Sequence, residues 1–169
     1  DAPVGSNKTV STLEDTAYTF AAADFGFSDP NDSPANALAQ VRIATLPGVG
    51  TLTNNGAALA SGDFVTLADI AAGNLKFTPA TNGNGAGYAS FTFQVQDDGG
   101  VLNGGVDLDA TPRTMSVNVT AVNDAPQGAN NTVSALEDTP YVFASVDFGF
   151  SDPSDSPANT LSAVKISTL

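Results

Sequence analysis

The chain has 169 residues, 41% of them hydrophobic, which suffices for one complete domain and part of another. It contains no cysteine and no histidine, which excludes disulfides, thiol or imidazole catalysis, and the usual ligands of zinc and copper. Its 18 acidic and 5 basic residues give a net charge of -13, which disfavours nucleic acid and anionic membranes as partners and favours hard cations such as calcium.

Alternation of apolar and polar residues predicts short strands, clearest at 90–96 and 115–120. Between strands, Asn55-Gly56 predicts a type I′ hairpin turn, and residues 67–73 predict one helical turn. Phe25 and Phe27, which flank Gly26 in a loop, are expected to plug the end of the sandwich, with a sugar contact as the alternative. The expected strands are 8–12, 17–22, 38–46, 50–53, 74–78, 88–96 and 113–122. Seven such strands predict an all-β, immunoglobulin/cadherin-like antiparallel β-sandwich.

The sequence repeats itself with an offset of 123 residues. Residues 24–30 return as 147–153, and about 32 of the 46 aligned positions are identical, without a gap up to Leu169. A period of this length predicts one independent domain per repeat. We therefore expect a complete sandwich at 1–123 and, at 124–169, the opening part of a second, truncated repeat with its first three strands.

Partners are predicted from this organisation. Neighbouring repeats of the same chain are the first, because the domains are strung in tandem. The apolar strand residues of the truncated second repeat would lack cover unless another chain or a swapped element supplies it, so this repeat could self-associate. No apolar run reaches the roughly 20 residues of a membrane span, and no direct membrane insertion is expected.

Acidic residues fall in the loops at the two poles of the predicted sandwich, and in the linker between repeats. Calcium takes about six to eight oxygen ligands in flexible geometry, which carboxylates from several loops can supply. The predicted ligands are Glu14, Asp15, Asn123, Asp124, Asp147, Asp152, Asp155, Asp29, Asp32, Asp97 and Asp98. A calcium ion shared at each repeat junction would stiffen it. The alternatives are that single acids form turns or caps, and that the charge serves only solubility.

Several segments, in this order, resemble the cadherin-like or bacterial immunoglobulin-like tandem repeats of large RTX-type adhesins and related bacterial surface proteins. They are 13–16, 28–30, 50–52, 75–80, 90–99 and 122–126. The resemblance implies type I secretion, display at the bacterial cell surface, and a role as an extender in adhesion or biofilm formation. It also implies junction calcium, held by Glu14, Asn123, Asp124 and the loop of Asp152 and Asp155. The segment 28–33 departs from the family because it lacks the Asp-x-Asp of true cadherins.

Two other function classes are alternatives to a calcium-stiffened spacer. A carbohydrate- or protein-binding module needs an exposed aromatic patch or apolar groove, and the absence of tryptophan argues against a sugar platform. An enzyme is disfavoured, because the adjacent carboxylates Asp97 and Asp98 should point apart and no nucleophile with a base accompanies them. The sequence therefore predicts a structural, non-enzymatic protein.

Overall fold

The computed structural model describes residues 1–168. The chain forms two compact units, Asp1–Thr120 (unit 1) and Ala121–Leu169 (unit 2). The boundary between the units lies three residues before the one expected from the repeat. None of the helices in the described part of the chain has the length and hydropathy that a bilayer-spanning helix needs.

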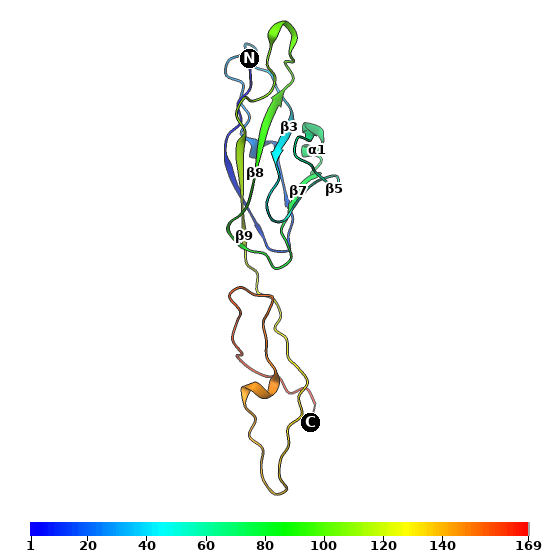
Figure 1. Cartoon of the computed structure of the whole chain (residues 1–169), viewed down its shortest axis with the longest axis vertical. Coiled ribbons are helices and arrows are strands. Elements are labelled where there is room, and N and C mark those ends of the chain that lie inside the picture. The colour runs from blue at the N-terminus through cyan, green and yellow to red at the C-terminus, as the bar shows by residue number, and fades with distance from the viewer. Residues whose placement is uncertain (169) are drawn as a thin grey trace. The chain divides into compact units, whose positions relative to one another are not determined.

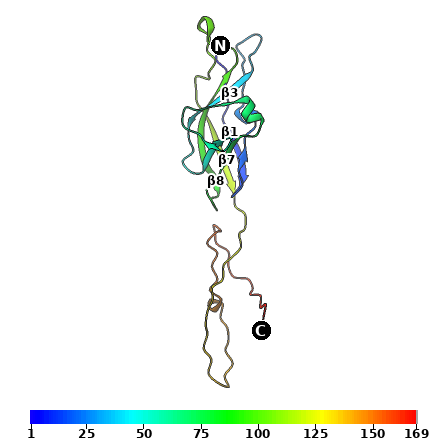
Figure 2. The ribbon, with the colours of Figure 1, turned by 90° about the vertical axis from the view of Figure 1, so that its right-hand side faces the viewer.

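Unit 1 is a sandwich of two β-sheets (Figures 1 and 2). Its strands are β1 (Lys8–Leu13), β2 (Tyr18–Thr19), β3 (Leu38–Thr45), β4 (Thr51–Asn54), β5 (Ala57–Ala58), β6 (Phe64–Thr66), β7 (Leu75–Thr78), β8 (Gly85–Asp97) and β9 (Arg113–Thr120). One sheet has the order β1-β9-β8-β3-β6 and the other β2-β7-β4-β5. β1 runs parallel to β9, and the other paired strands are antiparallel. The predicted all-β, immunoglobulin-like sandwich is confirmed.

The local predictions differ from the structure mainly between the fourth and fifth predicted strands. The Asn55-Gly56 turn is confirmed, since both residues have positive φ and join β4 to β5. The predicted helical turn is α1 (Leu67–Ala71), which begins with a hydrogen bond from the Asp69 amide to Thr66 Oγ1. The short strands β5 and β6 were not predicted, because two or three residues show no clear alternation. The strand expected at 17–22 shortens to two residues, because η1 (Ala22–Phe25) follows it.

The core of unit 1 lies between the sheets and is rich in phenylalanine. Phe91 and Phe93 of β8 point inward, as the alternation predicts, and are 1% and 0% exposed. Phe25 leaves η1 and is fully buried, with its ring 5.0 Å from that of Phe93 in an edge-to-face arrangement. Phe20 packs in the same way on Phe91, with ring centroids 5.6 Å apart. The expectation that Phe25 closes one end of the sandwich is confirmed.

A partly buried ion pair holds the N-terminal segment of unit 1 against β9. Asp109 is 3% exposed and accepts hydrogen bonds from Arg113 Nε (2.9 Å), Arg113 Nη2 (3.2 Å) and the Gly5 amide (2.9 Å). Burial raises the pKa of the Asp109 carboxyl, but hydrogen bonds from Arg113 and two backbone amides outweigh it and hold that pKa below its ordinary value.

We expect Asp109→Ala to lower the free energy of unfolding of unit 1 by about 2–3 kcal/mol at pH 7, because it leaves Arg113 and buried amides without an acceptor. Since the folded pKa is depressed, the contribution of Asp109 is present above the ordinary value of 3.8 and is lost as the pH falls through the folded pKa. Urea titrations of both proteins from pH 7 to pH 2 measure the difference. Asp63→Ala, at an exposed turn, is the control. If the loss of unfolding free energy caused by Asp109→Ala does not change with pH, the ionised Asp109 carboxylate is not its source.

Unit 2 has the sequence of the opening third of unit 1 without its sheets. Residues 121–168 contain η3 (Ser145–Phe148) and one isolated bridge, Gln127↔Ser151, but no strand of two or more residues. Val164 and Ile166 are 41% and 63% exposed, whereas Val41 and Ile43 at the same repeat positions are fully buried. In unit 1 those positions are paired with β8 and β6, and unit 2 has no counterpart of either strand among its described residues.

Candidate cation site

Three carboxylates meet at the pole of unit 1 where its N-terminus lies. Asp29 and Asp32 belong to the loop between η1 and β3, and Asp97 is the last residue of β8. Antiparallel pairing of β3 with β8 places Leu38 opposite Asp97, which brings that loop beside the end of β8. One oxygen of each carboxylate lies within 4.8 Å of the others. These three residues are called the acidic triad below.

Hydrogen bonds inside the loop hold two members of the triad in place. The Asn36 amide donates to Asp29 Oδ2 (2.6 Å), and Asn36 Nδ2 donates to Asp32 Oδ2 (3.1 Å). The amino group of Asp1 donates to both oxygens of Asp32 at 2.8 Å, and this contact raises the pKa of that amino group. Asp32 is half-buried, and its carboxylate is the most accessible of the three in the triad.

The other two members have oxygens without a hydrogen-bond donor. Asp29 is 7% exposed and Asp97 3% exposed. Asp29 Oδ1 and Asp97 Oδ2 are buried and accept no hydrogen bond from any residue in the range 1–168. Buried carboxylate oxygens in a folded protein nearly always have a donor or a metal, because desolvating an unpaired charge is costly. The triad therefore has the ligand atoms and the unmet charge that suit a bound cation.

The electrostatics of Asp97 fit this picture. Burial raises the pKa of its carboxyl above the usual range, against a lowering effect of the hydrogen bond from the Gly99 amide. The negative charges of Asp29, Asp107 and Asp32 raise it further. A Cβ at Gly99 would lie 2.2 Å from Asn36 Nδ2, so any other residue there would make the Asn36 side chain move. Asp32, Asn36, Asp97 and Gly99 also line an open pocket of about 270 Å³, through which an ion could enter.

The remaining predicted ligands at this pole have other partners. Asp98 accepts a hydrogen bond from the Ala37 amide (2.8 Å) and so fastens the loop to β8. Asp109, which was not among the predicted ligands, forms an ion pair with Arg113. Gly99 was not predicted as a site residue. The sequence signal for Gly99 is a glycine directly after an acidic pair that ends a strand.

Glu14 and Asp15 lie at the opposite pole of unit 1, as predicted, and not with the triad. Glu14 is buried and accepts a hydrogen bond from Asn84 Nδ2 (2.9 Å). Asp15 has a positive φ and accepts from the Asn82 amide (3.1 Å). These contacts close the turn after β1 against the loop between β7 and β8.

Unit 2 repeats the loop geometry of the triad. Asp152 accepts from the Asn159 amide (2.7 Å), and Asp155 accepts from Asn159 Nδ2 (2.8 Å), as their counterparts do in unit 1. The Asp124 amide donates to Asp155 (3.0 Å), where unit 1 has the amino group of Asp1. Asp152 is 6% exposed and its Oδ1 has no donor among the described residues, like that of Asp29. The loop therefore keeps its conformation without a strand like β8 beside it.

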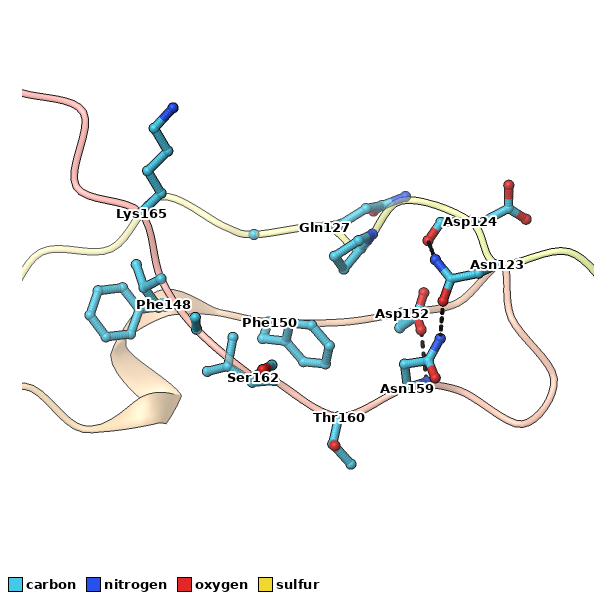
Figure 3. Close-up of a pocket in the computed structure, with 15 residues that line it drawn as sticks. Asn123, Asp124, Gln127, Phe148, Phe150, Asp152, Asn159, Thr160, Ser162 and Lys165 are labelled. Atoms are coloured by element: carbon cyan, nitrogen blue, oxygen red, sulfur yellow. Dashed lines mark hydrogen bonds between the residues drawn. The ribbon is translucent and has the colours of Figure 1, made fainter.

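The other two predicted ligands of unit 2, Asn123 and Asp147, do not belong to the loop of Asp152 and Asp155. Asn123 Oδ1 accepts a hydrogen bond from Asn159 Nδ2 (2.8 Å), which joins the linker to the loop (Figure 3). Asp147 caps η3 instead, accepting from the Ala144 amide and the Tyr141 hydroxyl. Asp24 does the same in unit 1, with Ala21 and Tyr18.

Comparison with known proteins identifies the family. A family model described as bacterial Ig domain matches residues 1–120. The chain belongs to the bacterial Ig domain family. Such domains are generally structural, non-enzymatic modules and typically occur in extracellular or surface proteins. No curated protein and no solved structure matches the chain.

The family match covers all of unit 1, so the acidic triad lies within the bacterial Ig domain. The part of the resemblance that concerns bacterial immunoglobulin-like repeats is confirmed.

Proposed function

We propose that this bacterial Ig domain is an extender repeat of a type I secreted bacterial surface adhesin, and that calcium stiffens the array of repeats in adhesion or biofilm formation. The internal repeat supports a tandem array, since a second copy follows unit 1 after a short linker that contains Pro126. The sandwich itself is a suitable spacer, because it is a rigid module with a chain end at each pole (Figure 1).

The observation that carries the calcium proposal is the pair of buried carboxylate oxygens without donors, Asp29 Oδ1 and Asp97 Oδ2. Asp32 would be the third ligand residue. All three offer oxygen only, which suits a hard cation, and calcium tolerates irregular, incomplete sites better than magnesium does. Bound there, calcium would supply the positive charge that offsets the mutual repulsion of the triad.

The same reasoning extends in part to unit 2, where Asp152 and Asp155 would hold the ion with the linker residues Asn123 and Asp124. Asp15, Asp98 and Asp147 remain proposed ligands only from the sequence, and Glu14 remains a proposed ligand as well. A carbohydrate-binding role gains no support, because most aromatic rings of unit 1 lie in or against the core.

Calorimetric titration of calcium into the metal-free full chain tests the proposal. We expect saturable binding, weaker binding of magnesium, and a higher melting temperature in calcium than in chelator, because the folded state binds the ion and the unfolded chain does not. Small-angle X-ray scattering of the full chain should show a narrower range of radii of gyration in calcium than in chelator. Equal melting curves with and without calcium would remove the cation from the proposal and leave a plain spacer.

A further inference from the structure

Four asparagines of unit 1 are each followed directly by a glycine. They are Asn55, Asn82, Asn84 and Asn103. In such a pair the amide nitrogen of the glycine can attack the side-chain carbonyl carbon of the asparagine, because glycine has no Cβ to crowd the approach. Ring closure requires the backbone and the side chain of the asparagine to rotate. The fold therefore decides which of the four pairs reacts, through the cost of opening the structure locally at each of them.

Hydrogen bonds restrain Asn82 and Asn84, in the loop between β7 and β8. The Gly83 amide, which is the nucleophile for Asn82, donates to the carbonyl oxygen of Ala80 (2.9 Å). Asn84 Nδ2 donates to the buried carboxylate of Glu14 (2.9 Å). Both asparagines are also half-buried. Reaction at either site would first require these hydrogen bonds to break.

The β4–β5 hairpin restrains Asn55, although this residue is exposed. Asn55 belongs to the two-residue turn, with the strand residues Asn54 and Ala57 paired directly beside it. Its amide donates to the carbonyl oxygen of Asn74 (3.1 Å). Its positive φ is the conformation that this turn needs. Rotation of the backbone at Asn55 would disrupt the pairing of the two strands, so the hairpin opposes ring closure.

Asn103 is held by neither kind of restraint. It is exposed and lies in the 3-10 helix η2 (Leu102–Gly104), within the glycine-rich loop between β8 and β9. Its φ of 57° and ψ of 27° are not helical, and its side chain makes no hydrogen bond with any residue of the range 1–168. A Cβ at Gly104 would meet no atom within 4 Å, so the surroundings of this glycine are open.

We infer that Asn103 is a site of spontaneous deamidation in the folded protein. The Gly104 nitrogen attacks Cγ of Asn103, the bond from Cγ to Nδ2 breaks, and ammonia leaves with the proton of the Gly104 amide. Water then opens the succinimide ring. Attack of water at Cγ gives aspartate, and attack at the backbone carbonyl carbon gives isoaspartate. Either product carries a new carboxylate, and no group is oxidised or reduced.

The new carboxylate would add negative charge to the pole that holds the acidic triad. Leu102 and Gly105, on either side of the reacting pair, line the same pocket as Asp32 and Asp97. Charges around a pocket attract a cation over distances of about 10 Å, and less as salt is added. Deamidation should therefore tighten the binding of a cation at the triad. This second step rests on the proposed function, whereas the deamidation itself does not.

Incubation of the folded full chain at mildly alkaline pH, followed by peptide mapping with tandem mass spectrometry, tests the inference. We expect Asn103 to convert at least about fivefold faster than Asn82 or Asn84, which is the effect of one hydrogen bond that those sites must break. Asn55 should also convert more slowly than Asn103. In urea, all four asparagines should convert at similar rates, because the fold no longer distinguishes them.

A matched pair of variants separates the site from its surroundings. Asn103→Gln should remove the reaction at this position, because glutamine would have to form a larger ring. Asn55→Gln should leave the conversion of Asn103 unchanged. Faster conversion of any other asparagine in the folded chain, or equal rates at all four, would overturn the inference.

Calcium titration of the Asn103→Asp chain and of the parent tests the second step. We expect the variant to bind calcium about two- to threefold more tightly at low salt, and the difference to shrink as salt is added. Equal affinities of the two chains would contradict the second step. Absence of binding by both would contradict the proposed function, and in either case the assignment of the deamidation site stands on the mass spectrometry.

Discussion

Replacing Phe25 with alanine should lower the free energy of unfolding of unit 1 by about 3–5 kcal/mol, as expected for a buried phenylalanine. Its side chain is fully buried, and its ring contacts those of Phe20, which directly follows β2, and Phe93 of β8. The protein around it cannot close the cavity easily, because β8 is held on both sides by paired strands. Urea unfolding followed by far-UV circular dichroism measures the loss.

Phe148→Ala is the matched control, because Phe148 occupies the same position of the repeat. It is only half-buried, and unit 2 offers it no ring like that of Phe93. We expect less than about 1 kcal/mol of change in the unfolding of the chain. Equal losses for the two substitutions would show that the local segment, and not its packing against β8, sets the contribution of this residue.

Removing one ligand from the triad should abolish the stabilisation by calcium. With free calcium at about 100 times its dissociation constant, binding contributes about 2.7 kcal/mol, which for a domain of this size raises the melting temperature by on the order of 10 °C. We expect Asp97→Asn to lose this rise. In chelator the variant should melt at or above the temperature of the parent, because the new amide group relieves repulsion and can donate to the unpaired Asp29 Oδ1.

Differential scanning calorimetry of parent and variant, in chelator and in calcium, measures both effects. Asp63→Asn removes the same charge from an exposed turn, where Asp63 accepts a hydrogen bond from the Ala60 amide, and should keep the full calcium response. If Asp97→Asn keeps that response as well, the ion does not bind at the triad. A loss of stability in chelator would mean that Asp97 has a structural role instead.

The sequence alone was sufficient for the features that depend on neighbouring residues. Alternation in 90–96 determined which residues of β8 face inward, and the conformational freedom of Asn55 and Gly56 determined a hairpin turn. The offset of 123 residues showed the repeat. The sequence also predicted acidic loops at both poles, although it could not determine which acids come together.

Only the tertiary structure decided the site. Asp32 and Asp97 are 65 residues apart, and the pairing of β3 with β8 brings them together, while Glu14 stays at the other pole with Asn84. Phe25 and Phe148 show the same limit, since identical local sequences end up buried in one unit and half-exposed in the other. Strand alternation and turns arise from short-range backbone preferences, whereas convergence of charges and burial of rings depend on which distant strands pair and in which register.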